Sequence, residues 1–373
     1  MSPAYARVYG FDESHTRFAS KYLLYLYREQ GRDPLPEEND EINDASGIPD
    51  TDADPDSRAG NAGFRLTGTP VLFIPGNAGS YKQVRSIAAK AAGLFYDSKE
   101  QIEALNGNVT SLDFFSADFN GDFTAFHGRT MLDQSEYLND AVRFILSLYR
   151  YNENPARSVI LLGHSMGGVV ARVMLTLPNY TKGSVNTIIT LAAPHAAAPA
   201  TFDKELLDLF TATDNYWRLG YSNMSIATKF DAKMTSSGQM LALEAHERLQ
   251  DVTLLSITGG ILDTTLPADY TVLTGLVPDS NGLTVATSGI PGVWTPMDHL
   301  AIVWCDQLRE ILAQTLLQVT DVSMRTIPRS RRMSIFRQNF VESADPLSEE
   351  SLDSFPWFGL KFDLRQLRDS ARE

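Results

Sequence analysis

The sequence lacks the features that mark disulfide-rich, membrane-spanning and nucleic-acid-binding proteins. Its only cysteine, Cys305, excludes an intrachain disulfide framework. It has no run of 18 apolar residues, so we expect no membrane-spanning helix within these 373 residues. Asp and Glu outnumber Lys and Arg by 46 to 32, giving a formal charge of −14. Nucleic acid requires a basic surface, so we expect no nucleic-acid partner.

The sequence also lacks a secretory signal and a metal-binding cluster. The N-terminus has no basic segment followed by an apolar one, as a secretory signal would. The histidines and the cysteine do not cluster at metal-ligand spacing, and we expect neither a metal nor a cofactor. What the chain does have is 43% hydrophobic residues, which is enough for a packed core of one large domain or two small ones.

The N-terminal part of the chain divides into two segments of different character. In residues 1–30 several apolar residues fall close to helical spacing, which predicts a helix from Thr16 to Glu29 that packs on the core. Residues 31–62 are dense in Asp, Glu and Pro and nearly lack large apolar residues. This composition predicts an acidic disordered linker.

Residues 158–177 indicate a strand, a sharp turn and a helix. An aliphatic and β-branched strand leads into Gly163-His164-Ser165-Met166-Gly167, the pattern G-x-S-x-G, and apolar residues at helical spacing follow it. A serine at this turn adopts a strained backbone, and the glycines avoid collisions with neighbouring side chains. The pattern alone occurs by chance, but the strand before it and the helix after it are its required context. We therefore predict that Ser165 is a nucleophile.

Strands and helices alternate on both sides of this turn, which predicts an α/β-hydrolase fold over residues 63–320. In that fold a mostly parallel sheet is covered by helices on both faces. Residues 196–250 interrupt the alternation and are rich in Met and aromatic residues, which predicts a helical cap insertion. The expected strands are 70–74, 112–119, 158–162, 185–192, 252–258 and 282–288.

The glycine-rich turn at 75–80 follows the first of these strands after the linker. α/β-Hydrolases place one oxyanion donor at such a turn and the other on the residue after the nucleophile. We accordingly expect the backbone N–H groups of Asn77 and Met166 to form the oxyanion hole. An ordinary turn or a phosphate cradle is the alternative, although no Walker lysine follows the glycines.

Chain order selects the general base. In α/β-hydrolases the order is nucleophile, acid, histidine, and His299 follows the last predicted strand. His195 is a rival, but it precedes every candidate acid. His164 lies inside the turn and is interpreted as a packing or hydrogen-bonding residue.

The acid is expected in the loop after the strand at 252–258. Asp263 lies nearest the strand end, and Asp269 and Asp279 compete for the role in the same loop. A buried carboxylate beside the imidazole would fix its tautomer and stabilise the imidazolium. Ser165, Asp263 and His299 together predict a carboxylic ester hydrolase.

Several motifs together resemble the eukaryotic GPI inositol-deacylase family. They are Pro75 to Tyr81, Gly163 to Gly168, Asp298 to Cys305 and the N-terminal Phe11 to Phe18 and Tyr25 to Glu29. The resemblance covers roughly residues 1–320. It implies a serine hydrolase of the endoplasmic reticulum, active in the lumen, that removes the acyl chain from the inositol of GPI-anchored proteins at the Ser165, Asp263 and His299 positions.

In members of that family, the part that resembles this chain is a lumenal hydrolase domain attached to membrane-spanning helices. We therefore expect a fragment that reaches the membrane through regions absent here, with residues 321–373 as a C-terminal tail that starts the missing region. Sequons at Asn108, Asn179 and Asn223 would permit glycosylation in the lumen. A general lipase or carboxylesterase and a catalytically inactive GPI-binding module are the alternative functions.

Overall fold

The computed structural model describes residues 4–33, 66–98, 109–199, 202–222, 236–321, 323 and 327–341. Nearly all of the expected linker at 31–62 lies outside the described residues, as do Asn108 and Asn223. The compact unit of the chain extends to Val341. In the described ranges no helix combines the length and the apolar character that a bilayer crossing requires.

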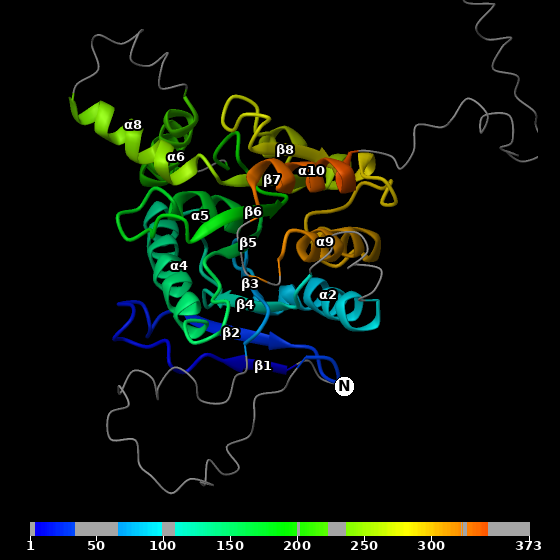
Figure 1. The fold of residues 1–373 in the computed structure, drawn as a ribbon. Helices are drawn as coiled ribbons and strands as arrows, with labels where there is room; N and C mark the ends of the chain where they lie inside the picture. The colour runs from blue at the N-terminus through cyan, green and yellow to red at the C-terminus, as the bar shows by residue number, and fades with distance from the viewer. Residues whose placement is uncertain are drawn as a thin grey trace, which may run out of the picture. The chain divides into compact units, whose positions relative to one another are not determined.

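The described residues form one eight-stranded sheet with the order β1-β2-β4-β3-β5-β6-β7-β8 (Figure 1). All neighbours from β4 to β8 pair in parallel, whereas β1 and β2 pair antiparallel at one edge. The predicted α/β-hydrolase fold is confirmed. The strands are β1 (Ala4–Arg7), β2 (Leu23–Arg28), β3 (Thr69–Ile74), β4 (Leu112–Asp118), β5 (Val159–His164), β6 (Val185–Leu191), β7 (Thr253–Thr258) and β8 (Gly282–Ala286).

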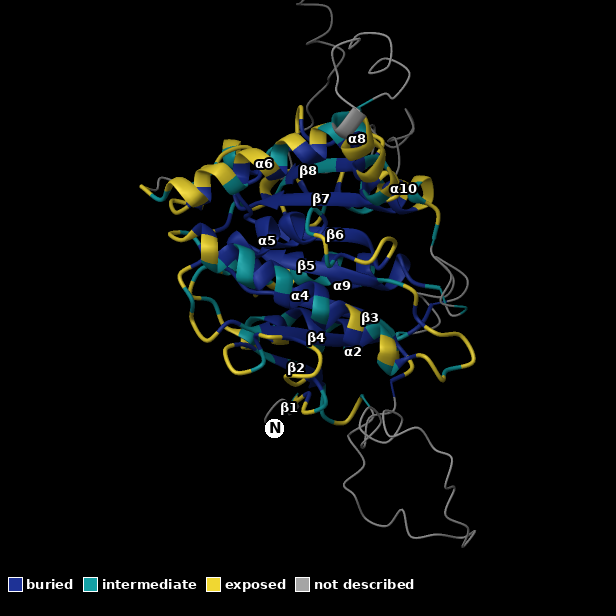
Figure 2. Cartoon of the chain, turned by 90° about the vertical axis from the view of Figure 1, so that its left-hand side faces the viewer, coloured by how far each residue is buried: buried dark blue, intermediate teal, exposed yellow. Residues whose placement is uncertain are grey.

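Helices cover both faces of the sheet, and the central strands are buried on both sides (Figures 1 and 2). Alternation along a strand sends Leu161 of β5 into the cluster with α4 and α5, and Ile160 into the cluster with α2 and α9. A strand covered on both faces needs apolar residues throughout, as β5 and β6 have. The helices are α2 (Arg85–Asp97), α4 (Gly128–Leu148), α5 (Met166–Met174), α6 (Lys204–Tyr221), α8 (Ser236–Leu249), α9 (Asp306–Gln318) and α10 (Arg329–Phe340).

The predicted helix from Thr16 to Glu29 is wrong, because β2 occupies Leu23–Arg28. The residues of β2 alternate with period two: Leu24 and Leu26 enter the cluster beneath α4, while Tyr25 stacks on Tyr81 with ring centroids 4.0 Å apart. Tyrosine also favours strands over helices. The apolar positions fit both periods, and pairing with β4 selects the strand.

Helices α6 and α8 occupy most of the stretch expected to form a cap. They pack on each other, and α6 also packs on α4. A buried ion pair between Arg172 of α5 and Asp214 of α6 joins this pair to the helix that follows Ser165. Trp217 adds a hydrogen bond from its Nε1 to the Arg172 carbonyl, at 3.1 Å. Coverage of the active site by these helices stays a prediction.

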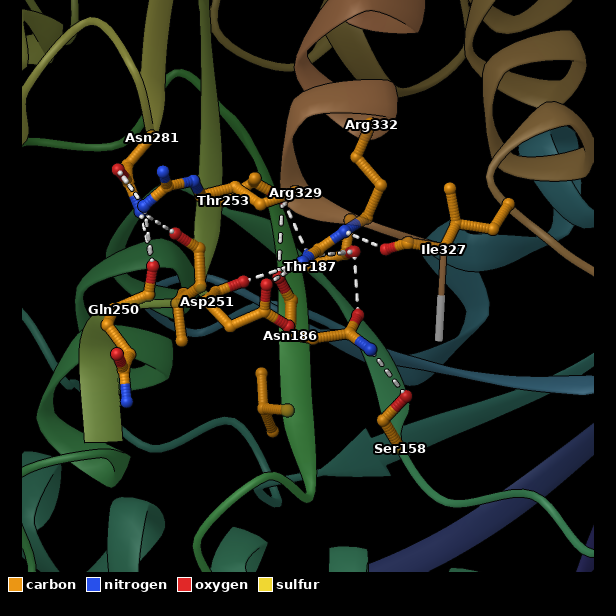
Figure 3. Close-up of polar contacts among 12 residues, drawn as sticks. Ser158, Asn186, Thr187, Gln250, Asp251, Thr253, Asn281, Ile327, Arg329 and Arg332 are labelled. Carbon is orange, nitrogen blue, oxygen red and sulfur yellow. Dashed lines mark hydrogen bonds and ion pairs between the residues drawn. The ribbon is translucent and has the colours of Figure 1, made fainter. Parts of the chain in front are cut away.

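The expected boundary at residue 320 is also wrong, because α10 packs on the core that precedes it. Met333, Phe336 and Phe340 are buried in the same cluster as α2 and α9. Arg332, which directly precedes Met333, is 1% exposed and reaches the amino ends of β6 and β7 (Figure 3). A helix that buries this much surface is part of the domain.

Arg332 holds α10 through every nitrogen of its guanidinium. Nε donates to the carbonyl of Ile327 at 2.9 Å, and Nη2 donates to the carbonyl of Asp251 at 2.6 Å. Nη1 donates to the Asn186 carbonyl and to the hydroxyls of Thr187 and Thr253 (Figure 3). Burial lowers the pKa of Arg332, and the Asp251 carboxylate opposes that shift.

Replacing Arg332 should therefore destabilise the domain. We expect Arg332→Met to lower the free energy of unfolding by about 3 kcal/mol, because several buried acceptors lose their donor. Urea denaturation measures the change. The neighbouring Arg331 is exposed, and Arg331→Met should stay within about 0.5 kcal/mol of the wild type. Equal unfolding midpoints for the two variants would contradict the anchoring role.

Candidate active site

Ser165 lies on a strained turn between β5 and α5. Its backbone has φ 54° and ψ −127°, and its N–H donates to the carbonyl of Leu191 at the end of β6, at 2.8 Å. A Cβ on Gly167 would lie 2.2 Å from the Ile74 carbonyl oxygen, and one on Gly163 would lie 2.7 Å from Gly168 Cα. Only glycine allows α5 to start this close to β3 and β5, and that approach lifts the serine above the sheet edge.

The structure brings Ser165, His299 and Asp263 together in one hydrogen-bonded chain. Asp263 Oδ2 lies 2.8 Å from Nδ1 of His299, and Nε2 of the same ring lies 2.9 Å from Ser165 Oγ. A carboxylate can only accept, so Nδ1 carries the hydrogen and the bare Nε2 accepts from the serine hydroxyl. This arrangement can draw the proton from the serine as its oxygen attacks a carbonyl carbon.

Asp263 is fixed by its own loop. Its side chain is fully buried, and Oδ1 accepts hydrogen bonds from the backbone N–H groups of Thr265 and Leu266, at 3.1 and 2.8 Å. The rival acids lie elsewhere: Asp269 is in a short 3-10 helix, and the Asp279 carbonyl accepts from Arg337. Sequence reasoning did not find the two N–H donors, although the short polar run after Asp263 is typical of such a turn.

The rings of the two rival histidines have hydrogen-bond partners other than Ser165. His195 is fully buried, with Nε2 2.9 Å from Thr190 Oγ1, and burial lowers its pKa well below the usual range. Nε2 of His164 lies 2.8 Å from the carbonyl oxygen of His299. Burial lowers the pKa of His164 to about 4, so this ring is neutral at pH 7.

The glycine-rich turn after β3 lies against Ser165. A Cβ on Gly76 would be 2.7 Å from Ser165 Cβ. The Ala78 and Gly79 N–H groups donate to the carbonyls of Asp122 and Gly76, whereas the Asn77 N–H has no acceptor among the described residues. Met166 opens α5, so its N–H belongs to the first helical turn, where no intrahelical acceptor exists. These are the two groups expected to form the oxyanion hole.

Asn179 is the one sequon asparagine within the described residues. Its Nδ2 donates to the Glu136 carbonyl at 2.9 Å and to Asp140 Oδ1 at 3.1 Å. Its Oδ1 accepts from Asn139 at 3.0 Å. A glycan on this nitrogen would have to break one of these bonds.

Comparison with known proteins places this site in a family. The model of the PGAP1-like alpha/beta domain matches residues 65–319, a range that includes Asn77, Ser165, Asp263 and His299. The chain belongs to this family. The resemblance seen in the sequence motifs is thereby confirmed.

Curated members of the family match nearly all of this chain. A GPI inositol-deacylase of Debaryomyces hansenii is 53% identical over 354 residues, which are 94% of this chain and 31% of the relative. A GPI inositol-deacylase of Kluyveromyces lactis is 48% identical over 94% of this chain and 32% of its own. The chain thus spans about a third of the length of these relatives.

Likeness to solved structures adds little to the observed topology. The 2,6-dihydroxy-pseudo-oxynicotine hydrolase overlaps 83% of this chain and 67% of its own, at 13% identity and a TM-score of 0.38. At that score the likeness carries no argument about the site of this PGAP1-like domain.

The neutral state of His164 should appear in the pH dependence of stability. Its pKa is about 4 when folded and 6.5 as the ordinary value. Above pH 6.5 the His164 ring is neutral in both the folded and the unfolded chain, so it contributes nothing to the pH dependence of stability. As the pH falls below 6.5, the unfolded chain takes up a proton that the folded ring refuses, so stability is lost. We expect a loss of about 2 kcal/mol from this residue at pH 4.5.

Urea denaturation of His164→Gln at pH 7 and pH 4.5 isolates this contribution, because glutamine does not titrate. Between pH 7 and pH 4.5 the wild type should lose about 2 kcal/mol more unfolding free energy than His164→Gln. His127 is exposed, and His127→Gln should keep the wild-type dependence. An identical pH dependence for all three proteins would rule out a neutral buried His164.

Proposed function

We propose that the protein is a serine hydrolase that removes the acyl chain esterified to the inositol of GPI-anchored proteins. The observation that carries this proposal is the hydrogen-bonded chain from Ser165 through His299 to Asp263 on a strained strand-to-helix turn. A serine beside an imidazole that a buried carboxylate orients is the arrangement that acyl transfer requires.

In the first half of the reaction, Ser165 Oγ attacks the ester carbon while His299 Nε2 takes its proton. The tetrahedral intermediate collapses to an acyl-serine, and the imidazolium returns the proton to the departing inositol oxygen. Asp263 stabilises the imidazolium in both steps. In the second half, His299 takes a proton from water, the hydroxide attacks the acyl-serine, and the fatty acid leaves as Ser165 regains its hydrogen.

The N–H groups of Asn77 and Met166 serve as the oxyanion hole. The carbonyl oxygen gains full negative charge only as the carbon becomes tetrahedral, so fixed donors favour the transition state over the ester. The side chain of Asn77 supports this role, because its Oδ1 accepts from the Ala125 N–H at 2.9 Å and ties the turn to the loop after β4.

An acyl chain as part of the substrate is supported by the apolar side chains around the site. The loop after β4 lies on one side of β5, while the loops after β7 and β8 lie on the other. Each contributes large apolar residues that are exposed: Phe123 and Phe126, Ile261 and Leu262, and Trp294 and Leu300. Leu262 adjoins Asp263 and Leu300 adjoins His299, so a hydrocarbon chain at Ser165 would meet apolar surface.

The rest of the substrate and the location are proposed from the relatives, which are GPI inositol-deacylases. GPI-anchored proteins are then the partners. The site of action is the endoplasmic reticulum membrane, with the catalytic domain in the lumen. Removal of the inositol acyl chain would support export and quality control of these proteins.

Release of fatty acid from an inositol-acylated GPI substrate tests the proposal. Ser165→Ala should reduce turnover to background. Asp263→Asn should reduce kcat by roughly 10³- to 10⁴-fold, because the wrong His299 tautomer is then favoured. Asp269→Asn is the matched control from the same loop and should stay within about twofold of the wild type.

Three results would overturn the proposal in different ways. Turnover retained by Ser165→Ala would exclude the serine mechanism. Equal cleavage of triglyceride or short esters would instead indicate a general lipase or esterase. Glycolipid retention without labelling of Ser165 by a fluorophosphonate probe would indicate a GPI-binding module.

A further inference from the structure

His164 precedes the nucleophile and faces the general base. His164 is 3% exposed, and its ring centroid lies 5.1 Å from that of His299, with the ring planes at 46°. The polar contact is with the main chain, because Nε2 lies 2.8 Å from the His299 carbonyl oxygen. The mechanism above assigns His164 no proton transfer, so this buried titratable group needs another explanation.

The chemistry of the contact determines the tautomer of His164. A carbonyl oxygen can only accept, so Nε2 carries the hydrogen and donates it. Nδ1 is then a bare acceptor, and it is buried with no hydrogen-bond partner among the described residues. A buried nitrogen without a hydrogen-bond partner lowers the stability of the folded chain.

His299 lies in a loop segment outside regular secondary structure. The segment starts at Trp294, which has φ 49°, and Met297 N–H donates to the Gly259 carbonyl at 2.8 Å. Asp298 Oδ1 accepts from the two N–H groups that follow His299. The hydrogen bond from His164 attaches the main chain of His299 itself, and it starts from the residue that adjoins Ser165.

We propose that His164 is a positioning residue that sets the distance between the His299 imidazole and the Ser165 hydroxyl through the His299 main chain. This inference rests on the proposed serine hydrolase mechanism. Asp263 orients the ring about its Nδ1, while His164 places the Cα that carries the ring. Together the two contacts leave Nε2 one position, against Ser165 Oγ.

Glutamine and asparagine separate this role from simple packing. The amide nitrogen of glutamine lies as far from its Cβ as the Nε2 of histidine does, so His164→Gln retains a donor toward the His299 carbonyl. Asparagine is one carbon shorter, and His164→Asn places its amide out of reach. Both variants are polar, uncharged and smaller than histidine, which makes them a matched pair.

The rate at which a fluorophosphonate probe labels Ser165 reads out the serine–imidazole geometry without the GPI substrate. We expect His164→Asn to lower the second-order rate constant by roughly 10- to 100-fold, because a displaced base activates the serine poorly. His164→Gln should stay within about threefold of the wild type. With the inositol-acylated substrate, the loss in His164→Asn should fall on kcat and leave KM unchanged.

Equal labelling rates for folded His164→Gln and His164→Asn would overturn the positioning role. A wild-type protein that does not label at all would instead overturn the proposed function, so the two failures are distinguishable. A third measurement needs no variant: ¹⁵N NMR of the wild-type imidazoles at pH 7 should find His164 as the Nε2–H tautomer. The Nδ1–H tautomer would exclude the hydrogen bond and end the proposal.

Discussion

The hydrogen bond between Ser165 Oγ and His299 Nε2 is the interaction on which the site depends, because it joins residues 134 positions apart. It forms only if the loops after β5 and β8 meet at one edge of the sheet. Parallel strands place their carboxyl ends at the same edge, where open α/β sheets bind ligands. Between these strands, β6 supplies the carbonyl that accepts from Ser165 N–H, and β7 leads to Asp263.

This edge stores backbone strain that the core must offset. Ser165, Ala78, Ala192 and Trp294 all have positive φ, and conformations of this kind cost on the order of 1–3 kcal/mol each. Ser165 cannot relax, because the close approach of α5 to β3 and β5 and the bond to the Leu191 carbonyl over-determine it. The buried strands on either side supply the rigidity that holds Ser165 and its hydrogen-bond partners in place.

Two buried arginines attach helices to the rest of the domain through hydrogen bonds and ion pairs. Arg332 joins α10 to the starts of β6 and β7, and Arg172 joins α5 to α6. Both side chains look like solvated charges in the sequence, so neither contact could be predicted from it. The arginine-rich stretch from Arg329 resembles a solvated tail in the sequence, because charged and polar residues separate its buried apolar residues and its anchor is itself a charge.

Features that depend on residues close together in the sequence could be predicted, whereas features that depend on distant strands could not. The turn at Ser165 was predictable, because its glycines and the flanking strand and helix are local. Chain order also favoured His299 over His195, because only His299 follows the candidate acids. The strand at Leu23–Arg28 was not predictable, because its apolar residues fit periods of 2 and 3.6 and only the neighbouring β4 decides between them.

The sequence by itself determined the alternation of strands and helices and the strained serine turn, since both follow from side-chain sterics over a few residues. Only the tertiary structure decided which of Asp263, Asp269 and Asp279 meets His299, and that His164 bonds the His299 main chain. The physical reason is that these contacts join loops from separate strands. Their distances depend on how the whole sheet twists and packs between its helices.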